Sequence, residues 1–301
     1  MNKLISMLER LYFLQEQPWC SQKSEGSGGP ACAAEGRLTS EILAKALAGE
    51  MSVALNLVSA DGMARAMVLG LKRASDWAVV AKLFQAVQEE LDLPTPALSV
   101  SGQAGYQLWF SLAEPVPVVQ ARIFLNALQR RYLADIPAAH LELHPKAEMP
   151  VFVELVPALH TLSGKWSAFI DPSMGSMFID ESGLEMAPNL DRQADMLAGL
   201  KPVKAADLER VLALFQVDAD RDTELAAQAA RQAEVATVAA IPDAGGAHAM
   251  LNVGGGFQRP CCFLLAVMND SSASAQHRID AAKALLPYFG ENCGEGRCQN
   301  P

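Results

Sequence analysis

The stretch that decides the fold is SGQAGYQLWF, residues 101–110, in which a glycine-rich turn leads into an apolar strand. Tyr106, Leu108 and Phe110 alternate with the residues between them, and this period of two is typical of a strand with one face against a core. Gln107 is an amide within this apolar run. Either it turns away from the core on a half-buried strand, or it belongs to a reactive site on that face. The stretch alone leaves both possibilities open.

The segments around this strand predict an α+β fold. Helices are expected at residues 38–49, 75–93 and 118–134. Strands are expected at residues 52–59, 65–71, 96–112 and 140–146, with a last strand ending at Asp171. The ADG turn at 60–62 should join the first two strands as a β-hairpin. This order favours helices on one side of a mainly antiparallel sheet.

The composition along the chain predicts six segments. These are an N-terminal amphipathic helix and linker (1–36), the main α+β domain (37–204), an alanine-rich helical segment (205–240), a linker (241–256), a C-terminal helical hairpin (257–290) and a disordered tail (291–301). In the hairpin, Leu264, Leu265 and Val267 should oppose Ile279, Ala282 and Leu285 or Leu286. Core packing or self-association through this hairpin is expected.

The charge balance restricts the possible partners. The 301 residues are 50% hydrophobic and 19% charged, with a formal net charge of −10. An acidic chain does not offer a general polyanion-binding surface, because nucleic-acid affinity rests largely on Lys and Arg neutralising phosphates. Contact with DNA or a nucleotide must therefore come from a local basic patch. The sequence predicts no membrane helix and no signal peptide, so a cytoplasmic location is expected.

The six cysteines match neither a paired zinc pattern nor a compact disulfide framework. Cys293 and Cys298 could pair or hold a metal, but a reducing cytosol favours free thiols.

Four segments together resemble the archaeo-eukaryotic primase (primase-polymerase) superfamily, in its bacterial and mobile-element branches. RAMVLGLKRASDW (65–77) resembles the strand of the hhhDhD metal motif, and SGQAGYQLWFSL (101–112) resembles the turn and strand of the second motif. LELHPK (141–146) resembles the third motif, and VPALHTLSGKWSAFID (156–171) resembles the loop that follows. The resemblance covers residues 38–200. It implies an RRM-like antiparallel sheet with packed helices, followed by a helical C-terminal segment.

The resemblance also implies a set of site residues. Gln107 stands where the family has a histidine that holds nucleotide phosphates, and Glu142 stands where it has its third metal carboxylate. The nucleotide-binding residues it implies are Ser101, Gly102, Gln107, Lys146, His160, Lys165 and, through its charge, Lys72. Each also has a structural interpretation, since Ser101 and Gly102 suit an ordinary turn. His160 is also typical of a hydrogen-bonded loop histidine, the lysines are typical of solvent-exposed side chains, and Glu142 could form a surface ion pair.

The first motif departs from the family at the two positions that matter for metal binding. Gly70 and Lys72 occupy the places of its two aspartates. Two-metal nucleotidyl transfer needs carboxylates there, whereas an ammonium about 4 Å from a divalent ion is repelled by roughly 8 kcal/mol at an effective dielectric of 20. No cofactor is therefore expected, and Mg²⁺ or Mn²⁺ would be needed only by an active enzyme.

Three functions follow as hypotheses. The first is a catalytically degenerate primase-polymerase-like protein of DNA replication or a mobile element, which retains nucleotide or DNA binding. The second is an active DNA primase or nucleotidyltransferase with Asp61 or Asp76 as substitute metal ligands. The third is a non-enzymatic assembly or packaging adaptor, because residues 263–289 are weakly similar to helices of phage small-terminase-like proteins.

Overall fold

A computed structural model describes residues 1–22, 32–33, 37–103, 105–146, 151–218, 221, 260–270, 273 and 275–285. The chain divides into two compact units, Met1–Leu225 and Ala226–Pro301, which are described separately. The expected linker at 241–256 and the expected tail at 291–301 lie outside the described residues, as do most of 21–36 and all of 222–240.

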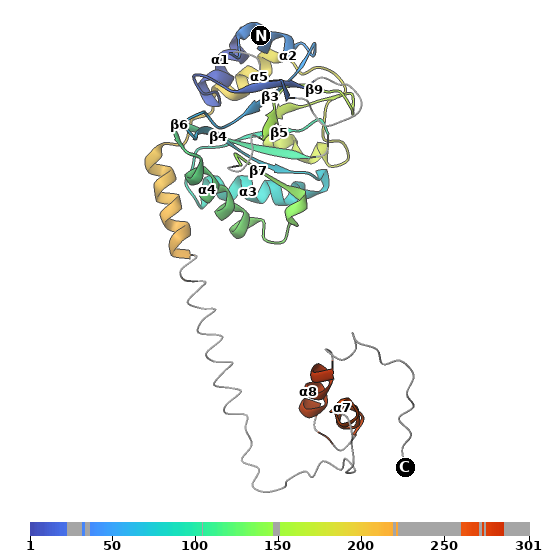
Figure 1. Ribbon diagram of the computed structural model, residues 1–301. Helices are drawn as coiled ribbons and strands as arrows, with labels where there is room; N and C mark the ends of the chain where they lie inside the picture. The colour runs from blue at the N-terminus through green and yellow to red at the C-terminus, as the bar shows by residue number, and fades with distance from the viewer. Residues whose placement is uncertain are drawn as a thin grey trace. The chain divides into compact units, whose positions relative to one another are not determined.

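A five-stranded antiparallel sheet forms the centre of the first unit (Figure 1). Its order is β11 (Ala168–Ile170), β5 (Ala97–Val100), β6 (Tyr106–Pro117), β4 (Met63–Leu71) and β7 (Leu141–His144). All four pairings are antiparallel. The predicted class, an α+β fold built on an antiparallel sheet with packed helices, is confirmed.

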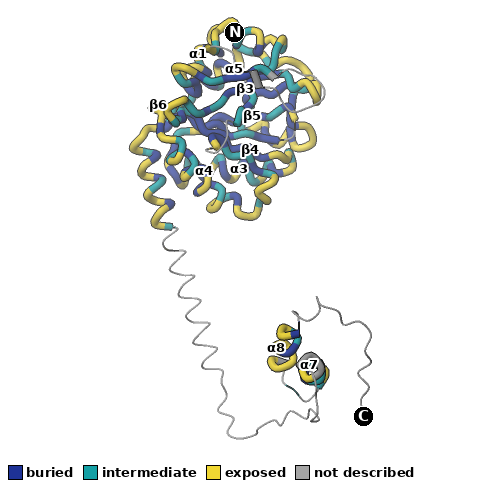
Figure 2. The backbone as a smooth tube through the Cα atoms, in the orientation of Figure 1, coloured by how far each residue is buried: buried dark blue, intermediate teal, exposed yellow. Residues whose placement is uncertain are grey.

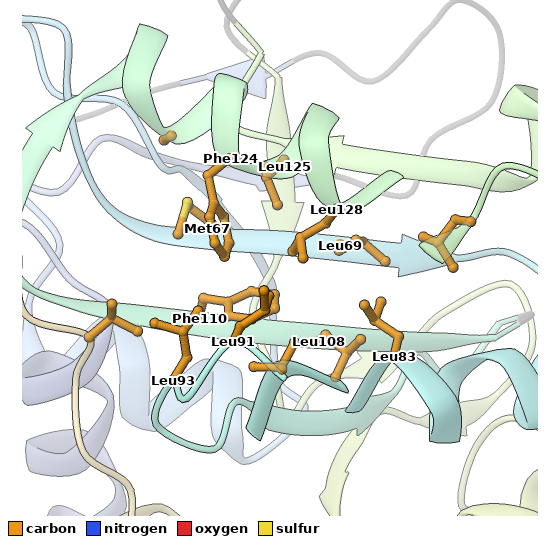
Figure 3. Close-up of a cluster of buried hydrophobic side chains, with 14 of the residues drawn as sticks. Met67, Leu69, Leu83, Leu91, Leu93, Leu108, Phe110, Phe124, Leu125 and Leu128 are labelled. Atoms are coloured by element: carbon orange, nitrogen blue, oxygen red, sulfur yellow. The ribbon is translucent and has the colours of Figure 1, made fainter. Parts of the chain in front are cut away.

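Two helices cover one face of this sheet, α3 (Trp77–Glu89) and α4 (Val118–Tyr132). Figure 3 shows Phe124, Leu125 and Leu128 of α4 packed over β4, and Leu83 of α3 packed close to β6. The alternating residues of the opening stretch, Tyr106, Leu108 and Phe110, point into this core and are at most 1% exposed. A strand with period-two apolar residues buries that face, as expected.

The other face of the sheet is also covered, so the expectation of helices on one side only is wrong. A four-stranded sheet lies there, with the order β2 (Cys32–Ala33), β1 (Trp19–Gln22), β3 (Ser52–Asn56) and β8 (Phe152–Glu154). Three helices share its core, α1 (Asn2–Leu11), α2 (Ser40–Leu47) and α5 (Leu190–Ala198). Trp109, which alternates with the buried residues of β6, is only 2% exposed because it packs in this second core. Figure 2 shows buried residues along the strands of both sheets.

The N-terminal helix belongs to the body of the first unit. Leu4, Ile5, Leu8 and Leu11 of α1 are at most 4% exposed, and β1 pairs with β3. The apolar side of an amphipathic helix is normally buried against other apolar residues, and here it packs into the core that the two sheets share. Cys20 on β1 is disulfide-bonded, although the sequence indicated no disulfide framework.

The expected hairpin between residues 52–59 and 65–71 does not form as a ladder. β3 pairs with β1 and β8, whereas β4 pairs with β6 and β7, so the two strands belong to different sheets. A single bridge between Val58 and Ala64 remains beside the turn. The local turn signal was correct, but the two strands pair in different sheets and bury their apolar residues in separate layers.

Shorter elements complete the first unit. They are three 3-10 helices, η1 (Ala74–Asp76), η2 (Ala138–His140) and η3 (Pro172–Phe178), and a two-stranded ribbon of β9 (Leu159–His160) and β10 (Lys165–Trp166). Residues 205–218 are helical, within the predicted segment 205–240. No helix in the described part of the chain is both long and apolar enough to cross a membrane.

The second unit contains α7 (Pro260–Asn269) packed against α8 (Ala275–Leu285). Val267, Ala281 and Leu285 are buried there. Ile279, which the periodicity placed in the contact, is 50% exposed. The register of α8 therefore differs from the expected one.

Candidate functional site

A row of four residues crosses the five-stranded sheet at the end of β4. In this row Ser99 of β5 pairs with Gln107 of β6, Gln107 with Gly70 of β4, and Gly70 with Glu142 of β7. Directly paired residues point to the same side of a sheet, so the four share one face. Because Gly70 has no side chain, a gap separates Gln107 from Glu142. The register of β4 and β7 thus sets Glu142 directly beside Gly70.

A cavity of about 470 Å³ opens over this row, lined on its other side by β8. Four residues that the sequence assigned to nucleotide binding or catalysis line it: Lys72, Ser101, Gln107 and Glu142. This volume lies within the range of small-molecule sites.

Lys72 and Glu142 form an ion pair inside the cavity, with Nζ 2.8 Å from Oε1. Nε2 of His144 lies 4.0 Å from the other carboxylate oxygen. The imidazole of His144 and the ammonium of Lys72 hold the pKa of Glu142 at about 2, against the opposing effect of burial. Glu142 is therefore ionised at neutral pH.

Gln107 is neither solvent-facing nor fully buried. Its Oε1 accepts from Trp109 Nε1 and from Ser99 Oγ, both at 3.3 Å. Its Nε2 donates no hydrogen bond within the described part of the chain. The amide oxygen is thus anchored while the amide N–H groups stay available at the cavity.

The turn before β6 is held by the Ser101 side chain together with a backbone hydrogen bond from Ser101 N–H to the Gly105 carbonyl. Oγ of Ser101 accepts from the N–H groups of Gln103 and Gly105, at 3.2 and 3.1 Å. Gly102 has a φ of 74°, and an added Cβ would stand 2.9 Å from the Ser167 nitrogen. Only glycine fits this conformation in this space. Ser101 lines the cavity, whereas Gly102 shapes the turn behind it.

The other three expected site residues lie outside the cavity lining. Lys165 pairs with Glu181 at 3.1 Å, and His160 Nδ1 lies 3.0 Å from Ser163 Oγ. Burial lowers the pKa of His160. Lys146 is exposed and lines a separate groove beside α4. The chain order of the motifs does not bring these three side chains to the cavity.

Two residues of the cavity lining that can carry charge near neutral pH were not assigned by the sequence, His144 and Glu154. His144 could have been found, because it follows Glu142 by two residues and shares its face. Glu154 carried no such signal, since it belongs to the other sheet. Its burial raises its pKa to about 7, against the effect of a hydrogen bond from Ser52.

The proposed substitute metal ligands are not at this site. Asp76 is 6% exposed and pairs with Arg73 at 2.9 Å, and Asp61 is exposed in the turn at the far end of β4. Among the described residues, no three or more His, Cys, Asp or Glu side chains are grouped as metal ligands would be. Neither Asp61 nor Asp76 lines the cavity, and the active-enzyme hypothesis itself stays a prediction.

Comparison with known proteins gives structural matches only. No protein-family model and no curated protein matches the sequence. The primase-polymerase (PrimPol) AEP domain of cyanophage S-2L is similar at 11% identity and a TM-score of 0.38, over 65% of this chain and 97% of that one. The polymerase domain of Mycobacterium tuberculosis Ligase D, solved in complex with DNA, is similar at 13% identity and a TM-score of 0.42, over 65% of this chain and 85% of that one. Both similarities are at low sequence identity and at a TM-score below 0.5.

Proposed function

We propose that this protein is a primase-polymerase-like nucleotide-binding protein that has lost nucleotidyl transfer. The observation that supports the proposal is the Lys72–Glu142 ion pair. The sequence aligns Lys72 and Glu142 with metal-binding carboxylates of the family that this chain resembles. The ligand is a nucleotide, free or at the end of a DNA strand, and it binds without a divalent metal.

The charges in the cavity support the loss of catalysis. Nucleotidyl transfer by two metals needs several carboxylates to hold both ions. At this position the row supplies one carboxylate, Glu142, and its charge is already compensated by Lys72. A divalent ion would have to displace the ammonium and then approach it closely, which electrostatics opposes.

The same side chains support nucleotide binding. Lys72 can give a phosphate a charge-assisted hydrogen bond, and Gln107 offers amide N–H groups that no protein group uses in the described structure. Neutral donors contribute about 0.5 to 1.5 kcal/mol each, so binding should be weak. Removing Lys72 would also leave Glu142 uncompensated, and its charge would then repel phosphate.

Titration of a fluorescent nucleoside triphosphate in EDTA at low salt tests the binding. Lys72→Ala should weaken it about tenfold and Gln107→Ala about threefold, since charge-assisted contacts are about twice as strong as neutral ones. Lys201→Ala is the matched control, because Lys201 is exposed and lies outside the cavity. Equal affinities for wild type and Lys72→Ala, or no binding at low salt, would refute the proposal. A labelled oligonucleotide in place of the triphosphate shows whether a strand end is preferred.

Primer synthesis with labelled nucleotides tests the loss of catalysis. Reactions in Mg²⁺ and, separately, in Mn²⁺ should yield no sustained product. Product that disappears in Glu142→Gln would show an active enzyme instead.

A further inference from the structure

Glu154 is a carboxyl group that faces the cavity from the opposite sheet. It lies on β8, and its backbone neighbour across the sheet is Ala54 of β3. The side chain is partly buried, and its one hydrogen bond within the described structure comes from Ser52 Oγ at a long 3.4 Å. A carboxylate normally needs more donors than this when it is removed from water.

The charged and titratable groups that share the cavity lining with Glu154 are Lys72, Tyr106, Glu142 and His144, of which Tyr106 donates its hydroxyl to the Gly175 carbonyl. Lys72 pairs with Glu142, and Glu154 forms no ion pair with Lys72 within the described structure. The neighbouring strand β3 contributes only the Ser52 hydroxyl. Burial accordingly raises the pKa of Glu154 to about 7, whereas that of Glu142 is about 2. One cavity thus holds one permanently ionised carboxylate and one carboxyl that exchanges a proton near neutral pH.

We propose that Glu154 is a ligand-binding residue of this cavity and that it acts in its protonated form, donating its O–H to a phosphate oxygen of the bound nucleotide. This inference rests on the proposed function, and it adds that the ligand binds together with a proton. An ionised Glu154 would repel the phosphate, whereas the neutral acid both removes that repulsion and supplies a donor.

The sign of the pH dependence follows from this coupling. A bound phosphate favours the protonated form, so binding takes up a proton whenever Glu154 is ionised in the free protein. Affinity should therefore be highest below pH 7 and fall by up to about tenfold per pH unit above it. Glutamine at this position is neutral at every pH and keeps an N–H donor of similar reach.

The test is a titration of the fluorescent nucleoside triphosphate in EDTA at constant ionic strength, from pH 6.0 to 8.5. Wild type is compared with Glu154→Gln, and Glu114→Gln controls for the loss of an exposed carboxylate on β6. The ionisation of the nucleotide itself changes both affinities by the same factor, so it drops out of the ratio of wild-type to variant affinity. Near pH 6 the ratio should be close to one, and at pH 8.5 Glu154→Gln should bind about tenfold tighter or more. Glu114→Gln should follow wild type.

A second measurement needs no variant. Calorimetry of the wild type at pH 8 in two buffers with different ionisation enthalpies should show uptake of up to one proton per nucleotide bound. Binding with parallel pH profiles for wild type and Glu154→Gln, or with no proton uptake, would overturn this inference and leave the proposed function intact. Absence of binding at every pH would overturn both.

Discussion

Lys72 and Glu142 form an ion pair across neighbouring strands, with Nζ 2.8 Å from the carboxylate, directly beside the side-chain gap at Gly70. Both side chains remain nearly half exposed, at 46% and 42%. An ion pair at this exposure stabilises a protein by less than about 1 kcal/mol. Its main consequence is therefore electrostatic, because it compensates the charge of Glu142.

Replacing the two substituted motif positions with aspartate should create a metal site. In Gly70→Asp with Lys72→Asp, three carboxylates would meet on adjacent strands with Glu142. An added Cβ at Gly70 would stand 3.3 Å from the Glu142 Cβ, so the neighbouring strand must shift slightly. We expect weak Mn²⁺ binding by calorimetry and a loss of stability of a few kcal/mol at most without metal.

The control for this site is the triple variant that also carries Glu142→Gln, which should lose the Mn²⁺ affinity. A double variant that folds and binds no Mn²⁺ would contradict the expected geometry. Sub-millimolar metal binding by the wild type, abolished in Glu142→Ala, would contradict the charge argument.

The pKa of Glu142 should respond to its two partners. NMR titration of its carboxyl carbon should give a pKa of about 2 in the wild type and a clearly higher pKa in Lys72→Met. His144 should keep the value in that variant below the ordinary 4.5. Because the folded-state pKa is depressed, the stability from this pair is present above pH 4.5 and is lost as the pH falls towards 2. An unchanged pKa in Lys72→Met would show that the ion pair does not form in solution.

Glu154 should make the free energy of unfolding fall as the pH rises. Its folded-state pKa of about 7 lies above its ordinary value of 4.5, so its contribution is fully present below pH 4.5 and is lost as the pH rises through 7. Between pH 4.5 and 8.5, the free energy of unfolding of Glu154→Gln should therefore rise relative to that of wild type by at most about 3 kcal/mol. Urea denaturation at several pH values measures this difference. A difference that is constant with pH would show that the carboxyl is not desolvated.

Replacement by alanine should have different effects on stability at two glycines. A Cβ at Gly175 would lie 1.9 Å from the ring of Trp77, so Gly175→Ala should destabilise the protein by about 1 to 3 kcal/mol. Gly199 has helical backbone angles and open space around it, so Gly199→Ala should be neutral or stabilising by up to about 1 kcal/mol. Thermal unfolding compares the two. A Gly175→Ala variant as stable as wild type would show that the Trp77 ring can move away.

The sequence by itself determined part of the local structure of the first unit, namely the central strands and the helices α3 and α4. Period-two apolar residues placed Tyr106, Leu108 and Phe110 in a core, and apolar residues at helical spacing placed α3 and α4. The resemblance of LELHPK to the third motif also predicted Glu142 as a site residue, and Glu142 lines the cavity.

Only the tertiary structure decided which strands share a sheet and which side chains meet in the cavity. β3 pairs within a second sheet instead of forming the expected hairpin. Strand β8 of that sheet places Glu154 in the lining of the cavity over Gln107, Gly70 and Glu142. Lys146, Lys165 and His160 belong to motifs adjacent in sequence, yet their side chains line other surfaces. The physical reason is that secondary-structure propensity depends on a few neighbouring residues. The packing of layers depends instead on apolar residues that are far apart in the chain and become buried together. The pKa values of Glu142 and Glu154 followed from that packing and not from residue type.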